Sequence, residues 1–191
     1  MERFVIAGLT NPEAEYRGTR HNIGADVVRA LATKLGLSFR RHRTPNDVAE
    51  GWSRPGGTPL TLGIGAGYMN RQGNPIGQLI KWANVPPERL IVVHDELDLP
   101  VGVLRTKRGG SGGHNGLKSV YRHIGSDQFI RLRFGIGRPP GRMDPAKYVL
   151  ARFSAKERES IVDVAVQEAV DALLDITEGP YEFAQQRLHS S

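Results

Sequence analysis

The chain has 191 residues, no cysteine, and 26 Lys and Arg against 20 Asp and Glu, which gives a formal net charge of +6 at pH 7. This length predicts one domain, 1–191. No run approaches the ~20 apolar residues of a membrane span, and no signal peptide opens the chain. Without cysteine, disulfides and thiolate chemistry are excluded, which fits a reducing cytoplasm. The basic surface indicates either a polyanionic partner such as nucleic acid or a merely solvated face.

The first half of the chain alternates strand and helix signals. An apolar run at 3–9 predicts a strand. Residues 22–35 predict a helix with one apolar face, capped by Asn22 and ended by Gly36. The elements expected next are two or three short strands within 38–64 and a helix at 73–84.

The second half continues the mixed pattern. The continuous apolar run 90–94 predicts a buried central strand. Ser154 and Glu157 form a capping box at the start of a predicted helix, 155–176. The remaining expected elements are strands at 101–107 and 129–136 and a short amphipathic segment at 181–188. The fold class is therefore α/β, a mixed twisted sheet with helices on both faces in three layers, α/β/α.

Four loops hold polar residues that stability alone does not require. They cover residues 11–22, 68–70, 94–98 and 109–116. Each lies near the end of a predicted strand or the start of a predicted helix, where sites gather in open α/β sheets. We expect these loops to converge on one cleft.

His21, in the first of these loops, is a candidate general base. It directly precedes a predicted helix, near the positive end of the helix dipole, which disfavours the imidazolium. The neutral ring that results is the form that accepts a proton near pH 7. The alternative is that His21 is a packed or capping residue.

The segment 94–98 brings acidic groups out of the most buried strand. A carboxylate there is costly unless it is paired, and a histidine ring N–H is a good partner because it fixes the tautomer and stabilises the cation. Asp95 is the candidate for that pairing. The rival is a metal site of His94, Asp95, Glu96 and Asp98, but alternation along an extended segment sends these side chains to two faces.

Glycines dominate the segment 109–116. It contains the G-x-S-x-G pattern of a nucleophile elbow, with Ser111 as nucleophile, but that motif needs a strand directly before it and Lys107-Arg108 stand there instead. No Gly-Lys-Ser/Thr follows, so it is not a Walker loop. We interpret it as a flexible loop, lid or phosphate nest that ends at Asn115, whose amide is suited to a substrate carbonyl or a water.

Basic residues flank the same loop. Arg105 and Lys107 occupy alternate positions of one predicted strand, and Arg131 and Arg133 alternate positions of the next, so each pair shares a face. Two such pairs predict a phosphate clamp. A solvated basic face is the alternative.

Taken in order, these loops resemble bacterial peptidyl-tRNA hydrolase. The matching stretches are GLTNPEAEYRGTRHNIG (8–24), YMNRQG (68–73), HDELDLPVG (94–102), GGHNGLKS (112–119) and RLRFGIGRP (131–139). The resemblance implies a monomeric α/β enzyme, without metal or other cofactor, that cleaves the ester bond of peptidyl-tRNA and recycles tRNA from peptidyl-tRNAs that left the ribosome prematurely. It implies tRNA as the partner, held at its acceptor stem, 5′-phosphate and 3′ end.

The resemblance also assigns roles to residues. His21 matches the family's catalytic base, Asp95 the carboxylate that supports it, and Asn11 the asparagine that distinguishes N-blocked from free aminoacyl esters. The candidate substrate- and tRNA-binding residues are Tyr16, Tyr68, Asn70, His114, Asn115, Arg105, Lys107 and Arg133. The last three match the cluster that grips the 5′-phosphate.

The chain departs from the family pattern in two loops. Thr10 and Glu13 stand where glycines are common around Asn-Pro, and Gly65-Ala66-Gly67 and Arg71-Gln72-Gly73 flank the Tyr-Met-Asn segment. These changes leave the His–Asp–Asn set intact. Two other functions stay open: a catalytically silent RNA-binding relative on the same fold, as in plant organelle intron splicing, and a serine esterase at Ser111.

Overall fold

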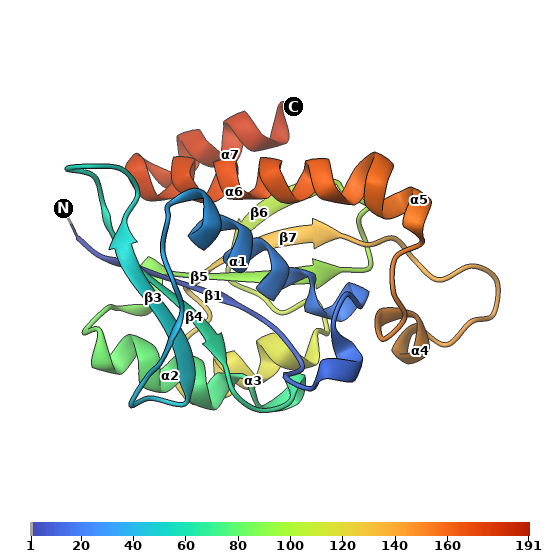
Figure 1. Cartoon of the computed structure of the whole chain (residues 1–191), viewed down its shortest axis with the longest axis horizontal. Coiled ribbons are helices and arrows are strands. Elements are labelled where there is room, and N and C mark those ends of the chain that lie inside the picture. The colour runs from blue at the N-terminus through green and yellow to red at the C-terminus, as the bar shows by residue number, and fades with distance from the viewer. Residues whose placement is uncertain (1) are drawn as a thin grey trace.

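A seven-stranded sheet forms the centre of the computed structural model, which describes residues 2–191 (Figure 1). The strands are β1 (Phe4–Gly8), β2 (Arg40–Arg41), β3 (Asn46–Trp52), β4 (Pro59–Gly65), β5 (Leu90–Glu96), β6 (Leu104–Arg108) and β7 (Ile130–Gly135). Their order is β2-β3-β4-β1-β5-β7-β6. The central strands β4, β1, β5 and β7 run parallel, and β2, β3 and β6 pair antiparallel at the two edges. The predicted mixed sheet is confirmed.

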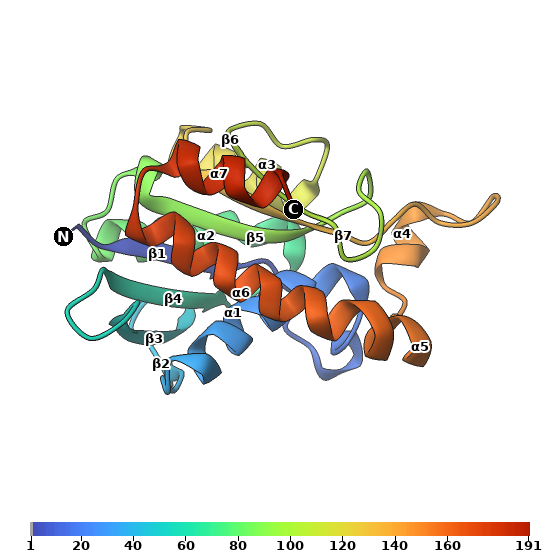
Figure 2. The same ribbon diagram turned by 90° about the horizontal axis from the view of Figure 1, so that it is seen from above.

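Helices cover both faces of this sheet, so the predicted three layers are also confirmed (Figures 1 and 2). They are α1 (Ile23–Lys34), α2 (Gly73–Trp82), α3 (Asn115–Ile124), α4 (Pro145–Val149), α5 (Ala155–Glu157), α6 (Asp163–Glu178) and α7 (Tyr181–His189). Helices α1, α6 and α7 lie on one face and α2 and α3 on the other, while α4 lies beyond the end of the sheet. Within residues 2–191, no helix has both the length and the apolar content to cross a membrane.

The local signals of the sequence are mostly confirmed, with three differences. Asn22 occupies the cap position of α1, but its side chain makes no capping hydrogen bond. The capping box of Ser154 and Glu157 is present, yet the predicted helix passes through a π turn, Arg158–Val162, before α6 begins. The strand expected from residue 101 begins at Leu104 because the chain first turns at Gly102, whose φ is +79°.

The core is divided by the sheet into two apolar layers. Ile6 and Val93 point toward α1 and α6, whereas Val5 and Val92 point toward α2 and α3. This alternation along each strand is the pattern of a sheet covered on both sides. Burial of both faces fixes the register of β1 and β5, and with it the positions of the residues at their carboxyl ends.

Two glycines let α1 approach the sheet closely. A Cβ on Gly24 would lie 2.1 Å from the carbonyl oxygen of Val93, and a Cβ on Gly8 would lie 2.5 Å from the carbonyl oxygen of Gly24. Only a residue without a side chain fits either position. This contact sets the distance between the start of α1 and the end of β5.

We predict that Gly24→Ala lowers the free energy of unfolding by about 2 kcal/mol or more, because backbone would have to move to admit the methyl group. Gly77→Ala is the matched control, since a Cβ there meets its nearest atom at 3.6 Å. That change should raise stability by about 0.5–1 kcal/mol. Urea unfolding of both variants tests this, and equal effects would contradict the proposed contact.

Candidate active site

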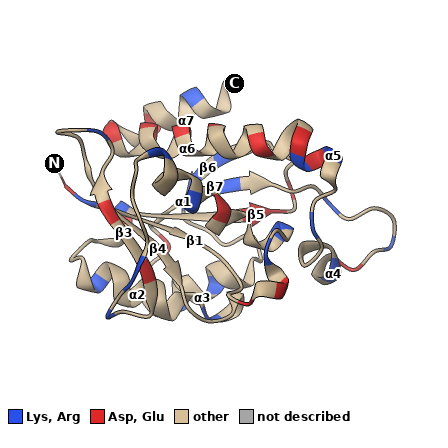
Figure 3. Cartoon of the chain, viewed as in Figure 1, with Lys and Arg blue, Asp and Glu red and all other residues tan. Residues whose placement is uncertain are grey.

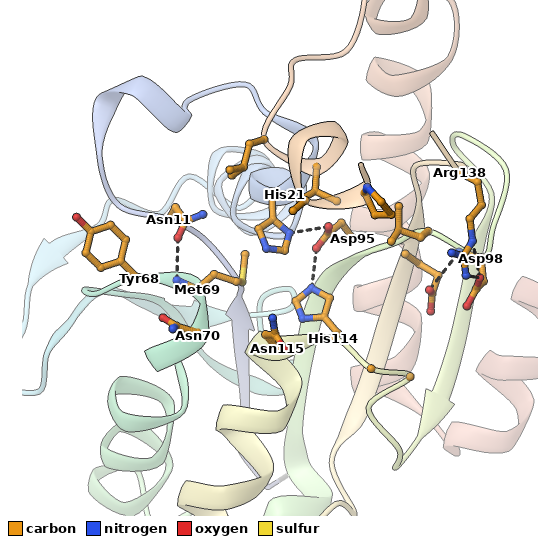
Figure 4. Close-up of a pocket in the computed structure, with 18 of the residues that line it drawn as sticks. Asn11, His21, Tyr68, Met69, Asn70, Asp95, Asp98, His114, Asn115 and Arg138 are labelled. Carbon is orange, nitrogen blue, oxygen red and sulfur yellow. Dashed lines mark hydrogen bonds and ion pairs between the residues drawn. The ribbon is translucent and has the colours of Figure 1, made fainter. Parts of the chain in front are cut away.

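A cavity of about 760 Å³ lies at the carboxyl ends of the parallel strands. Loops from all four predicted segments line it, so their convergence is confirmed (Figure 4). The predicted site residues that line it are Asn11, His21, Tyr68, Asn70, Asp95, His114 and Asn115. Tyr16, in the 3₁₀ turn Ala14–Tyr16, and the basic residues of β6 and β7 lie outside this lining.

Asp95 is the centre of the site. Its side chain is 3% exposed, and each carboxylate oxygen accepts one hydrogen bond from a histidine. Nδ1 of His21 lies 2.7 Å from Oδ2, and Nε2 of His114 lies 2.7 Å from Oδ1 (Figure 4). Burial alone would raise the pKa of Asp95, but the hydrogen bonds from His114 and His21 and the favourable electrostatic interaction with both rings outweigh it and hold that pKa well below its ordinary value. The carboxylate is therefore ionised.

His114 is fixed as one tautomer by its position at the start of α3. Its Nδ1 accepts hydrogen bonds from the backbone N–H groups of Gly116, at 3.1 Å, and Leu117, at 3.4 Å. Nδ1 must therefore be unprotonated, and Nε2 carries the hydrogen that binds Asp95. With both nitrogens in use, His114 positions the carboxylate and is no base.

His21 is arranged differently. The 3₁₀ turn Arg20–Asn22 leads directly into α1, as the sequence predicts, and the ring lines the cavity. Because the ionised Asp95 only accepts hydrogen bonds, Nδ1 of His21 is the protonated nitrogen. Its Nε2 has no protein partner among residues 2–191, and in the neutral ring this nitrogen carries the lone pair. A neutral imidazole with one free nitrogen is the form that a general base requires.

Asn11 is held rigidly beside the histidine. Its side-chain oxygen accepts the backbone N–H of Met69 at 2.8 Å, which fixes the orientation of the amide. Its backbone is held by Asn22, whose side chain binds both the N–H, at 2.8 Å, and the carbonyl, at 2.9 Å. This use of Asn22 replaces the predicted helix cap. The amide NH₂ of Asn11 therefore remains as a hydrogen-bond donor (Figure 4).

Further polar side chains stand on the opposite side of the cavity from His21. Asn70 follows β4, and Asn115 is the first residue of α3 (Figure 4). Neither side-chain amide has a hydrogen-bond partner within the described residues. Tyr68 donates its hydroxyl to Glu13 across the cavity rim, and this bond raises the pKa of Tyr68. Glu13, which stands where the family commonly has glycine, thus fixes the ring of Tyr68.

The basic residues of β6 and β7 form a separate surface. Arg105 lies opposite Arg133 and Lys107 opposite Arg131 in the antiparallel ladder, so all four share one face, as predicted. Figure 3 marks the positive charge on these two strands. Arg133 donates from Nε to Glu96 at 2.9 Å.

Comparison with known proteins shows the family to which this chain belongs. The sequence model of the family described as peptidyl-tRNA hydrolase matches residues 5–191. Peptidyl-tRNA hydrolase of Kineococcus radiotolerans is 45% identical over 195 residues, 99% of this chain and 98% of the relative. That of Mycobacterium tuberculosis is 45% identical over 191 residues, again 99% and 98%.

The crystal structure of the Acinetobacter baumannii peptidyl-tRNA hydrolase aligns with a TM-score of 0.86 and 33% identity, covering 97% of this chain and 93% of that one. This chain belongs to the peptidyl-tRNA hydrolase family. The resemblance found in the loop motifs is confirmed, and it extends to the whole fold.

The structure bears on the two alternative sites of the sequence analysis, the acidic metal site at 94–98 and the nucleophile Ser111. Glu96 binds Arg133 and Asp98 binds Arg138, whereas Asp95 binds the two histidines, so Asp95 is separated from the other two acids as expected. Three other groups, on His21, Asp95 and His114, lie within 4.8 Å of one another. A cation there would have to replace both 2.7 Å hydrogen bonds of Asp95. Ser111 lies outside the cavity lining.

The sequence analysis missed one wall of the cavity. Helix α4 supplies the apolar residues Pro145, Ala146 and Val149. Asp144 caps this helix by accepting the N–H of Ala146 at 3.1 Å, and proline follows at the first helical position. The Asp-Pro pair is a helix-start signal and was sufficient to predict a short helix.

Arg20 joins this wall to the turn that carries His21. Its backbone N–H donates to Ala151 at 3.0 Å, and its Nη1 donates to the carbonyl of Tyr148 at 3.2 Å. The guanidinium also lies 4.0 Å above the ring of Tyr148. Helix α4 and the turn that carries His21 are therefore tied by one buried side chain.

His94 gives the site a pH-dependent stability. Burial, with a smaller electrostatic contribution from the neighbouring His114, lowers the pKa of His94 from 6.5 to about 3. The unfolded chain therefore binds more protons than the folded chain between these values. The stability contribution is complete above pH 6.5 and is lost as the pH falls, by up to about 1.4 kcal/mol per pH unit.

We predict that His94→Gln flattens the pH dependence of the unfolding free energy between pH 6.5 and pH 4, whatever its effect on absolute stability. Urea unfolding at several pH values measures both slopes. Parallel curves for the two proteins would show that His94 is not the titrating group.

Proposed function

We propose that the protein hydrolyses the ester bond between a peptide and the 3′ ribose of tRNA and so returns tRNA to translation. Membership of the peptidyl-tRNA hydrolase family supports the reaction. The observation that carries it is the ionised Asp95 held between two histidines, of which only His21 has a free nitrogen facing the cavity. We further propose one domain over 1–191 that acts as a monomer in the cytoplasm.

The mechanism begins with water bound at Nε2 of His21. As the water attacks the ester carbonyl, its proton passes to Nε2 and the imidazolium is stabilised by the carboxylate of Asp95. General-base catalysis of this kind contributes ~10²–10⁴-fold. On collapse, the proton returns to the departing ribose oxygen, which leaves the peptide acid and free tRNA.

Charge develops on the carbonyl oxygen during this attack. The side-chain amides of Asn70 and Asn115, which have no partner within residues 2–191, are proposed to donate to that oxygen. Preorganised donors of this kind stabilise a transition state more than a substrate, because they need not reorganise as the charge appears. Asn115 is set at the first turn of α3, where His114 fixes the backbone.

Asn11 is proposed to select N-blocked substrates. Its side-chain oxygen already accepts the backbone N–H of Met69, so within residues 2–191 its NH₂ is the group left to bind substrate. A donor suits a carbonyl oxygen, and an N-blocked substrate has one acyl carbonyl more than a free aminoacyl ester. The extra hydrogen bond then favours the blocked form.

The tRNA is proposed to lie across β6 and β7 with its 3′ end in the cavity. The cations of these strands form the charged surface nearest the glycine-rich loop, and such contacts give salt-sensitive, sequence-independent affinity. A catalytically silent RNA-binding relative would not need the ordered His21–Asp95–His114 set, and this supports the enzymatic function.

We predict that His21→Ala reduces turnover of N-acetyl-aminoacyl-tRNA by at least ~10²-fold while its affinity for tRNA changes little, since the base is removed and the cationic surface is not. His42→Ala is the control, because that ring packs on Trp82 away from the cavity. Single-turnover kinetics and tRNA binding measure the two effects. Normal turnover by the His21 variant would refute the assignment.

Asn11→Asp tests selectivity. The aspartate keeps an oxygen for Met69 but loses the NH₂ donor, and its charge attracts the ammonium of a free aminoacyl ester. The ratio of kcat/KM for N-acetyl-aminoacyl-tRNA to that for aminoacyl-tRNA should fall about tenfold, the worth of one hydrogen bond of ~1–1.5 kcal/mol. An unchanged ratio would exclude Asn11 as the selective group.

A further inference from the structure

Two side-chain hydrogen bonds join the loop that follows β1 to the loop that follows β4, at one side of the cavity. The inner bond is buried and runs from the backbone N–H of Met69 to the side-chain oxygen of Asn11, at 2.8 Å. The outer bond lies at the surface, where the hydroxyl of Tyr68 donates to the carboxylate of Glu13. The mechanism proposed above uses only the inner bond, which orients Asn11.

Tyr68 stands at the entrance of the cavity. Its ring lines the cavity beside Asn11 and Asn70, and 47% of the residue is exposed (Figure 4). An exposed side chain samples several rotamers unless a contact holds its far end. A side chain that becomes ordered only when a ligand binds weakens the affinity, because its freedom is then lost in the binding step. Order in this ring before binding is therefore an advantage.

The backbone that leads into Tyr68 has little intrinsic rigidity. Its sequence at 65–67 is Gly-Ala-Gly, and a Cβ on Gly67, where φ is +99°, would meet no atom within 4 Å. The buried side chain of Gln72 compensates, since its Nε2 donates to the carbonyl oxygens of Gly65, at 3.2 Å, and Gly67, at 2.8 Å. The main chain is thus held, and the freedom that remains is that of the Tyr68 ring.

Glu13 is itself well placed to hold the ring. Its backbone carbonyl accepts the N–H of Tyr16 at 3.0 Å, so its carboxylate extends from a fixed turn. The hydrogen bond from Tyr68, followed by one from Glu15, lowers the pKa of Glu13, while the same bond to Glu13 raises the pKa of Tyr68. At neutral pH an ionised carboxylate therefore meets a neutral phenol, which makes the bond a charge-assisted one.

We propose that Glu13 is a positioning residue that holds the ring of Tyr68 at the cavity entrance and so orders it before substrate binds. The proposal rests on the proposed function, because peptidyl-tRNA is the substrate whose binding it improves. The lining of the cavity does not include Glu13, so its effect is exerted through Tyr68. Neither residue bonds to His21 or Asp95, and the expected change is therefore in KM and not in kcat.

The bond is tested without substrate, so that its failure is separate from failure of the hydrolase assignment. Tyrosine labelled with ¹³C at Cζ is titrated by NMR, and Tyr68→Phe assigns the signal of Tyr68. In Glu13→Ala we expect the pKa of Tyr68 to fall toward its ordinary value and ¹³C relaxation to report a more mobile ring. The exposed Tyr121, on α3, should titrate alike in both proteins. An unchanged titration of Tyr68 would overturn the proposal.

Kinetics test the consequence for substrate. Glu13→Ala should raise KM for N-acetyl-aminoacyl-tRNA about fivefold and leave kcat unchanged, the effect expected from the loss of one hydrogen bond. Tyr68→Phe removes the same bond, so the double variant should be no worse than either single variant. Glu13→Gln keeps an acceptor oxygen for the hydroxyl and should restore KM to within about twofold of the original value. Tyr121→Phe is the matched control and should leave KM as it is.

Three kinetic results would overturn the proposal. An unchanged KM in Glu13→Ala would show that the ring needs no partner. A Glu13→Gln variant as poor as Glu13→Ala would show that the charge of Glu13, and not its bond to Tyr68, acts on the substrate. Additive effects in the double variant would show that the two residues act independently.

Discussion

The carboxylate of Asp95 determines how the rest of the site is arranged. It is buried at the end of a central strand, where an ionised group is unfavourable unless it is fully bonded. Two histidines from different parts of the chain satisfy it, one from the turn before α1 and one from the start of α3. The two rings differ in their second nitrogen: Nδ1 of His114 accepts two backbone N–H groups, whereas Nε2 of His21 has no partner among residues 2–191.

This arrangement depends on close packing that lies outside the cavity. Gly8 and Gly24 bring α1 against β1 and β5, so that the turn before α1 meets the carboxyl end of β5. The capping of α3 by His114 holds the second ring from the opposite face of the sheet. The two histidines thus come from opposite faces of the sheet and meet Asp95 where the parallel strands end, a common location for α/β sites.

The sequence was sufficient to predict the parts of the protein that depend on local pattern. Apolar periodicity located the main strands and helices, alternation correctly separated Glu96 from Asp95, and the spacing of Arg131 and Arg133 placed them on one face. What it could not supply was three-dimensional contact. Asn22 is a residue type that commonly caps helices, but its side chain instead binds the backbone of Asn11, eleven residues earlier in the chain.

The contacts of His114 and the burial of Arg131 could not be predicted for the same reason. A histidine within a glycine-rich stretch gives no sign that it bonds a strand nineteen residues earlier. Likewise, an arginine in an alternating strand predicts an exposed cation, and its burial follows only from where the glycine-rich loop folds. Orientation of the Asn11 amide also depends on a donor, Met69, that lies 58 positions away.

Arg20 has a consequence for the range of peptides that the cavity admits. One wall of the cavity is α4, and Arg20 fastens that helix to the turn that carries His21. Bulky residues near the ester can gain room by displacing α4, but the strain then reaches the imidazole through its immediate neighbour in the chain. The size of the peptide residue that fits against α4 is therefore limited by how far the ring of His21 can move without losing contact with the attacking water.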